Sequence, residues 1–196
     1  MSIWVPGYVE TNRFFDAEHC PDPAPAGYEG CLVYAGGSSA AHAWDLDEIR
    51  RAKSVVKRML PVWVPTPGSD NPVKAGQDFV AWLKAHNVPT SKEAGYPVHL
   101  MWDAETGKEP DPGWLDIACQ VTSAAGWWNL IYGSLSVIFF QPPRDGYVVA
   151  NPTGQPHMYP HQMVKATQYA FNVPVTGGTI DQSLVSVELA GQLWAV

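Results

Sequence analysis

The chain has 196 residues, of which 46% are hydrophobic and 16% are charged, and its formal net charge is −7. This length and apolar content predict one globular domain, residues 1–196, with 1–11 as an N-terminal extension. The acidic balance argues against nucleic acid as a partner, because no basic patch offsets the phosphate charge. No apolar stretch is long enough for a membrane span and no signal peptide is recognisable, so we expect a protein made in the cytoplasm.

Neither a disulfide framework nor a metal or cofactor site is expected. The three cysteines are odd in number and lack any CxxC spacing, which favours reduced thiols. His157 and His161 have a spacing that would suit metal ligands on a helix. However, Pro156 and Pro160 disfavour a helix there, so a surface loop is the preferred interpretation. A metal-dependent hydrolase using these two histidines is a third, weaker hypothesis.

Short strand-like runs alternate with helix-like stretches along the chain. The patterns predict eight strands: Asn12–Asp16, Gly30–Ala35, Pro61–Pro65, Val98–Glu105, Asn129–Tyr132, Tyr147–Ala150, Lys165–Tyr169 and Thr179–Asp181. They also predict three helices: Leu46–Leu60, Val73–Ala85 and Gly113–Ala125. Such alternation favours parallel strands joined by crossovers. We therefore predict an α/β fold, a (β/α)8 TIM-like barrel with shortened helices, and an open doubly wound sheet is the alternative.

The predicted strand Val98–Glu105 ends in two acids. Side chains alternate along a strand, so Asp103 and Glu105 share one face with His99 and Met101, opposite a wholly apolar face. Acids crowded inside a fold cost free energy unless they are paired or used. Because ligands bind at the carboxyl ends of parallel strands, this strand indicates an acid-lined carbohydrate or hydrolytic site.

Four acids lie at or just past predicted strand ends: Asp16, Asp103, Glu105 and Asp181. In a barrel these ends converge on one mouth, where crowding moves the pKa values of the acids apart and keeps one of them protonated. Cleavage of a glycosidic bond needs such a proton donor and a second carboxylate. The alternative is a set of ordinary turn acids, some of them paired with Arg13 and Arg144.

The strand Val98–Glu105 resembles the D-x-E strand of the glycoside hydrolase family 25 lysozymes (muramidases). It is more similar still to the glycoside hydrolase-like barrels of actinobacteria and their phages. Six further stretches resemble motifs of these barrels in the same order: Phe14–Asp16, Leu32–Gly37, Leu60–Pro65, Leu130–Tyr132, Thr167–Tyr169 and Thr179–Asp181. The resemblance covers nearly the whole chain from Asn12 onward.

The resemblance implies a role for each candidate residue. Glu105 would protonate the glycosidic oxygen, and Asp103 would assist the N-acetyl group of the substrate or stabilise the developing positive charge. Asp16 and Asp181 would complete an acidic floor. The groups that would face the sugar are Tyr34, Tyr132, Gln168 and Tyr169.

Two hypotheses of function follow from this resemblance. The first is a glycoside hydrolase of the muramidase type that cleaves the glycan strands of peptidoglycan, acting at the cell wall after phage release. The second is a catalytically weak or inactive barrel that serves as a structural or glycan-binding part of a phage virion or cell envelope, with other virion proteins as partners.

Overall fold

The computed structural model describes residues 11–37, 42–66, 71–104, 111–138, 141 and 144–196. The strands are β1 (Thr11–Asp16), β2 (Gly30–Gly37), β3 (Arg58–Val64), β4 (His99–Asp103), β5 (Trp128–Ser134), β6 (Gly146–Ala150), β7 (Val164–Val175), β8 (Gly178–Ser186) and β9 (Trp194–Ala195). The helices are α1 (Leu46–Lys53), α2 (Pro72–Ala85), α3 (Ser91–Ala94), α4 (Pro112–Ala124), α5 (Leu135–Ile138) and α6 (Val187–Gly191). Within the described ranges, no helix is both long enough and apolar enough to cross a membrane.

Strands β1 to β8 form a closed barrel. Each strand pairs with the next one along the chain, and pairing between β8 and β1 closes the ring. The neighbours from β1 to β7 are parallel, whereas β8 is antiparallel to both β7 and β1. The predicted TIM-like barrel is therefore confirmed and the open sheet is wrong, but the expectation that every strand is parallel fails at β8.

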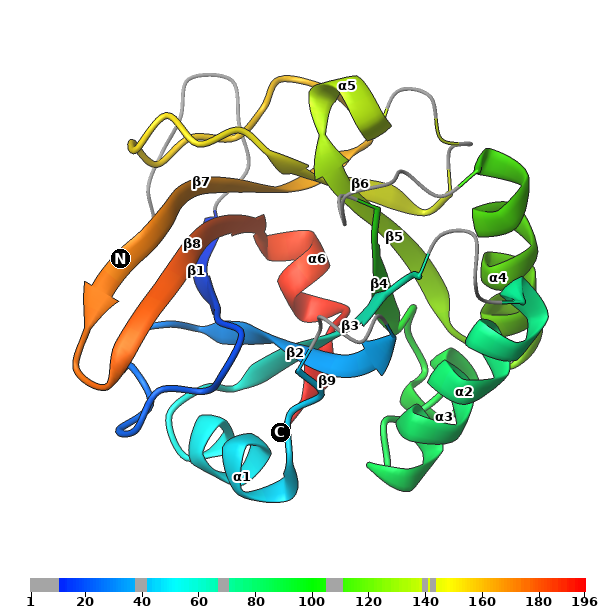
Figure 1. The fold of residues 1–196 in the computed structure, drawn as a ribbon, viewed down its shortest axis with the longest axis horizontal. Helices are drawn as coiled ribbons and strands as arrows, with labels where there is room; N and C mark the ends of the chain where they lie inside the picture. Colours follow the sequence, from blue (N-terminus) through cyan, green and yellow to red (C-terminus); the bar gives the residue numbers. More distant parts are fainter. Residues whose placement is uncertain (1–10, 38–41, 67–70, 105–110, 139–140, 142–143) are drawn as a thin grey trace.

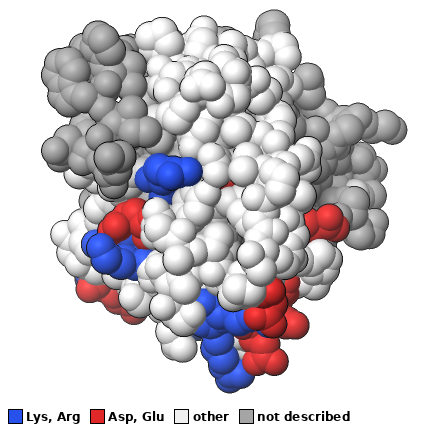
Figure 2. Space-filling view, turned by 90° about the vertical axis from the view of Figure 1, so that its left-hand side faces the viewer, with Lys and Arg blue, Asp and Glu red and all other residues white. Residues whose placement is uncertain are grey.

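The helices cover only part of the barrel (Figure 1). Viewed as in Figure 1, α1 lies below the barrel, α2, α3 and α4 lie on its right, and α5 lies above it. The hairpin of β7 and β8 extends on the left without a helix over it. Figure 2 views this side and shows a mostly uncharged surface, with basic and acidic side chains next to each other toward its lower part.

The lumen of the barrel is filled by one apolar side chain after another. Its buried cluster consists of Phe14, Leu32, Leu60, Val62, Met101, Leu130, Val148, Ala166 and Val185, with Leu189, Ala190 and Leu193 from the region of α6. Helix α6 follows the carboxyl end of β8, so it closes the end of the barrel opposite the carboxyl end of β1. In Figure 1 this helix lies across the lumen. The carboxyl ends of β1 to β7 lie at the other end of the barrel.

A second core lies between the strands and the outer helices. Trp63 and Trp102 point outward from β3 and β4, and each ring packs against Phe79 of α2 at a centroid distance of 5.4 and 5.3 Å, respectively. The indole N–H of Trp102 donates a hydrogen bond of 2.8 Å to Asn129 Oδ1. Part of the aromatic content therefore packs the layer between strands and helices.

The predicted helix Leu46–Leu60 is too long. Asp45 does cap it, and its side chain forms a reciprocal capping box with Glu48, but the helix ends at Lys53. From Arg58 the chain is β3, in which Met59 and Leu60 are buried on opposite faces, in the outer core and the lumen, respectively. The two apolar residues matched the helical spacing by chance, because two adjacent apolar residues also suit a strand buried on both faces.

Candidate active site at the barrel mouth

Three of the four predicted acids lie at the same end of the barrel. Asp16 is the last residue of β1 and Asp103 is the last residue of β4. Asp181 lies near the start of β8 and is in register with Asp16. It reaches the mouth because β8 is antiparallel, so its amino end lies beside the carboxyl end of β1. Glu105, the predicted proton donor, lies outside the described residues.

Asp16 is the most perturbed of these acids. Burial raises its pKa from 3.8 to about 7, with further contributions from the charges of Asp181 and Asp103. Two hydrogen bonds act in the opposite direction, one from the Tyr34 hydroxyl to Oδ2 at 3.2 Å and one from the backbone of Ala17. Oδ1 is buried and has no hydrogen-bond partner among the described residues. The Asp16 carboxyl therefore holds its proton in much of the population near neutral pH.

Asp181 is held by two donors. Its Oδ1 accepts a hydrogen bond from the backbone N–H of Asn172, and its Oδ2 accepts one from Gln168 Nε2, each at 2.8 Å. Burial raises the pKa of Asp181, while these two hydrogen bonds oppose the rise. Gln168 Oε1 in turn accepts a hydrogen bond from the Tyr132 hydroxyl. A chain of hydrogen bonds thus links β5, β7 and β8 and fixes which way the Gln168 amide points.

Three of the four predicted sugar-facing groups lie in this mouth. Tyr34 contacts Asp16, Gln168 contacts Asp181, and Tyr132 is in register with Asp103 on the neighbouring strand. Burial raises the pKa of Tyr34 well above its ordinary value, and the nearby Asp16 charge adds to the rise. Tyr34 is therefore a neutral hydrogen-bond donor throughout the physiological pH range.

Tyr169 does not join them. It follows Gln168 on the same strand, so its side chain points to the opposite, outer face, where it packs with Met158 and Leu184. Its hydroxyl donates a hydrogen bond of 2.8 Å to Gln182 Oε1. The expectation that Tyr169 faces the sugar is thus corrected: Gln168 and Tyr169 are neighbours in a strand and cannot both face the lumen.

One contributor to the site was missed. Asn172 binds Asp181 through its backbone N–H and has a left-handed conformation, with φ of 52°, where the register between β7 and β8 shifts. Asparagine tolerates this conformation better than most residues. That tolerance is the only signal in the sequence, and it does not indicate which acid the N–H will meet.

Other candidates from the sequence lie elsewhere. His157 is held in its own loop, with Nε2 at 3.1 Å from Asn151 Nδ2, and His161 Nδ1 accepts a hydrogen bond from the N–H of Met163. The two histidines do not form a ligand group with a third His, Cys, Asp or Glu among the described residues. His99 is buried at the start of β4, against the ring of Trp128, whereas Asp103 lies at the other end of the same strand.

The fold and the mouth together define a TIM-like barrel with an apolar lumen and a carboxylate-lined entrance. No protein-family model matches the sequence, and no curated protein matches it. Solved structures do match. An uncharacterized protein from B. stearothermophilus superimposes with a TM-score of 0.68 at 15% identity, over 93% of this chain and 100% of that chain.

Two lysozymes have the same fold. A family GH25 lysozyme from Aspergillus fumigatus gives a TM-score of 0.63 at 12% identity, over 93% of this chain and 99% of that chain. The muramidase from Acremonium alcalophilum gives 0.64 at 12% identity, over 89% of this chain and 93% of that chain. At these identities the likeness establishes the fold. The chain therefore shares the barrel fold of these lysozymes, and the predicted resemblance to family 25 barrels is confirmed at the level of the fold.

Proposed function

We propose that the protein is a glycoside hydrolase of the muramidase type, which cleaves glycan strands of peptidoglycan in the carboxylate-lined mouth. The observation that carries the proposal is that Asp16, Asp103 and Asp181 converge on one end of the barrel, with Asp16 the most perturbed of the three. This buried carboxyl has its pKa raised to about 7 and lies opposite Asp181, within the electrostatic reach of Asp103. Glycosidic cleavage uses paired carboxyl groups of which one is protonated and one ionised, and such crowding separates their pKa values.

In this proposal each residue of the mouth has its own role in cleavage of the glycosidic bond. Glu105 protonates the leaving glycosidic oxygen, a role that rests on the motif resemblance. Asp103 is the ionised partner that orients the N-acetyl group or stabilises the positive charge on the sugar ring. Asp16, bound by Tyr34, keeps its proton and so lowers the negative charge that Asp103 and Asp181 face. Gln168 and Asn172 hold Asp181 at the floor of the mouth.

The proposal is tested by incubating purified protein with isolated cell walls and measuring the release of reducing ends. The unmutated protein should release them, and Glu105→Gln should abolish the release. The matched control is Glu188→Gln, because Glu188 is an exposed acid at the start of α6, at the opposite end of the barrel. Equal activity in Glu105→Gln and the parent would remove Glu105 from the mechanism.

A binding assay separates this proposal from the second hypothesis. Sedimentation with insoluble peptidoglycan, without any release of reducing ends, would indicate a glycan-binding barrel. A place in a phage virion or a cell envelope, with virion proteins as partners, stays a prediction that the motif resemblance alone supports.

A further inference from the structure

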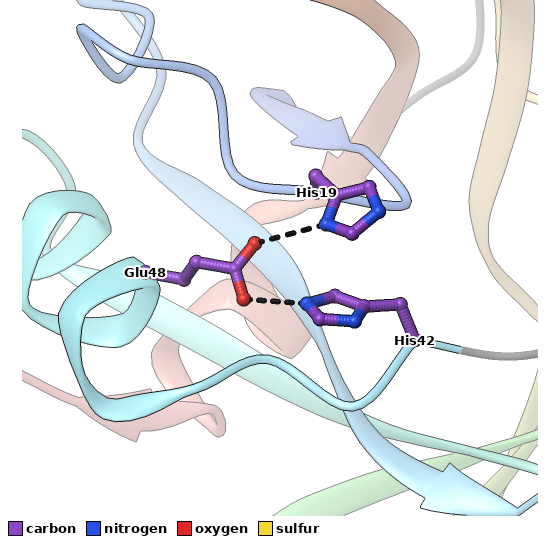
Figure 3. Close-up of side chains that lie close together, drawn as sticks. All are labelled: His19, His42 and Glu48. Carbon is purple, nitrogen blue, oxygen red and sulfur yellow. Dashed lines mark hydrogen bonds and ion pairs between the residues drawn. The ribbon is translucent and has the colours of Figure 1, made fainter.

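Two histidines meet one buried carboxylate beside the barrel mouth (Figure 3). His19 lies in the segment after β1, His42 lies between β2 and α1, and Glu48 is in the first turn of α1. His42 Nε2 is 2.7 Å from Glu48 Oε2, and His19 Nδ1 is 3.5 Å from Glu48 Oε1. Figure 3 shows both rings directing a nitrogen at this carboxylate, one at each oxygen.

Two backbone N–H groups hold the Glu48 carboxylate independently of the histidines. The backbone N–H of Cys20 donates to Oε1 at 3.0 Å, and that of Asp45 donates to Oε2 at 2.9 Å. Burial acts to raise the pKa of Glu48, but the hydrogen bonds from Asp45, His42 and Cys20 prevail and hold it below its ordinary value. Each oxygen keeps a lone pair directed toward the histidines, because a carboxylate accepts about four hydrogen bonds in all.

The two segments that carry the histidines are tied to each other. The indole N–H of Trp44 donates to the carbonyl oxygens of Ala17 and Glu18, at 3.2 Å each. The backbone N–H of Trp44 donates to Tyr34 O in β2 at 2.9 Å. The buried Trp44 side chain therefore fixes the segment of His19 against the segment of His42, which favours a preformed site.

We infer that His19, His42 and Glu48 form a binding site for a divalent transition-metal ion, with Zn²⁺ the best fit. One ligand atom from each residue lies within 4.8 Å of the other two. Tetrahedral Zn²⁺ with bonds of about 2.0–2.1 Å holds neighbouring ligand atoms roughly 3.3 Å apart. His42 Nε2 lies 2.7 Å from Oε2 and His19 Nδ1 lies 3.5 Å from Oε1, both near that spacing, so small side-chain rotations bring the two nitrogens and one carboxylate oxygen around a single ion.

The ligand types select the ion. Two imidazole nitrogens and one carboxylate oxygen suit Zn²⁺ and its neighbours in the first transition row, whereas Ca²⁺ and Mg²⁺ prefer oxygen ligands throughout. Three protein ligands leave a fourth position open. Among the described residues the site is partly open to solvent, since the side chains of His19 and His42 are 63% and 33% exposed while that of Glu48 is 5% exposed.

A bound ion would connect two segments beside the mouth of the barrel. His19 is three residues beyond Asp16, and the ion would join this segment to the start of α1. The site is built from residues other than the mouth acids. Metal binding and glycan cleavage are therefore separate properties that can be tested independently.

The test is calorimetric titration of Zn²⁺ into the full chain after treatment with a chelator. We expect saturable binding of one ion per chain, weakened about 10- to 100-fold or more in His19→Ala and in His42→Ala, since even the partners of metal ligands contribute that much. His157→Ala is the matched control, a histidine in a loop outside the cluster, and should bind as the parent does. Absence of saturable binding, or binding unchanged in His42→Ala, would overturn the inference.

A second measurement identifies the ligands. Co²⁺ in a four-coordinate site with nitrogen and oxygen ligands absorbs intensely in the visible range, and this band should appear in the parent and vanish in His42→Ala. Circular dichroism of each variant checks that it is folded. Replacing a partly exposed histidine should leave the fold intact. Displacement of the Co²⁺ band by millimolar Mg²⁺ or Ca²⁺ would contradict the assignment to a transition metal.

Discussion

Asp16 and Asp181 face each other in register across the antiparallel pair of β1 and β8, at the open end of the barrel. Their charges repel, and the consequence is seen in Asp16, whose pKa is raised to about 7 by burial first and by Asp181 next. Near neutral pH this pair therefore shares a proton, which Asp16 holds.

Replacing Asp16 by Asn should stabilise the protein more at pH 7.5 than at pH 4.5. The pKa of Asp16 is about 7 in the folded state and about 3.9 in the unfolded chain, so between these values the folded state binds the extra proton. The free energy of unfolding of the parent is therefore undiminished by Asp16 below pH 4 and falls as the pH rises toward 7, whereas Asn at this position does not titrate. The difference between the two pKa values corresponds to about 4 kcal/mol of stability. This value is an upper limit, because Asp16 titrates together with the neighbouring acids.

Urea denaturation of the parent and Asp16→Asn at both pH values measures this effect. Asp78→Asn on the exposed face of α2 is the control and should change stability by the same small amount at each pH. A difference between the parent and Asp16→Asn that is independent of pH would show that Asp16 has an ordinary pKa.

Tyr34→Phe should raise the pKa of Asp16 further. The Tyr34 hydroxyl donates to Oδ2 at 3.2 Å and favours the ionised form, so its loss favours the protonated form. The carboxyl-carbon chemical shift of Asp16, followed by NMR across a pH titration, reports the pKa directly. Tyr96→Phe, in the segment between α3 and β4, should leave it unchanged, and a lower pKa in Tyr34→Phe would refute the role of the hydroxyl.

Gln168→Leu should destabilise the fold by about 2–3 kcal/mol. The substitution leaves both the Tyr132 hydroxyl and Asp181 Oδ2 without the partner that Gln168 supplies in a buried setting. Chemical denaturation gives the change in the free energy of unfolding. Gln120→Leu on the exposed face of α4 should change it by less than about 0.5 kcal/mol, and an equally small change in Gln168→Leu would mean that the chain of hydrogen bonds contributes little.

Gly30→Ala should be among the most damaging single substitutions in the barrel. A methyl group at this position would overlap the ring of Phe14 and lie 2.6 Å from the carbonyl oxygen of Arg58. We expect a loss of about 3 kcal/mol, measured by thermal unfolding. Gly191→Ala, where nothing lies within 4 Å, should be neutral or stabilising by up to about 1 kcal/mol. Similar unfolding temperatures for the two variants would contradict the tight packing of β1, β2 and β3.

The sequence predicted the barrel because strand–helix alternation and in-order motifs depend on local patterns. It mispredicted Arg58–Leu60 as helix, since a run of apolar residues buried on both faces of a strand has no distinct period. It located Asp181 correctly for the wrong reason: the residue was placed at the carboxyl end of a parallel strand, but it lies near the amino end of an antiparallel one. Strand direction depends on long-range pairing that no local window contains.

The site shows the same division between local and long-range information. Side-chain alternation placed Asp103 in the mouth, and the same rule applied to Thr167–Tyr169 would have placed Gln168 inside and Tyr169 outside. The cluster of His19, His42 and Glu48 could not be predicted, because its members are separated along the chain and meet only when β1, β2 and α1 come together. The backbone donor of Asn172 was equally invisible.

The most direct test of the proposed activity is the release of reducing ends from purified peptidoglycan by the parent and by Asp103→Asn, with the sugar at the new end identified by mass spectrometry. The proposed activity predicts new reducing ends at muramic acid with the parent. It also predicts a loss of at least about 100-fold in Asp103→Asn, because this variant lacks the carboxylate proposed as the partner of the proton donor. Cleavage by Asp103→Asn at the rate of the parent, or no cleavage by the parent at any pH between 4 and 8, would contradict it.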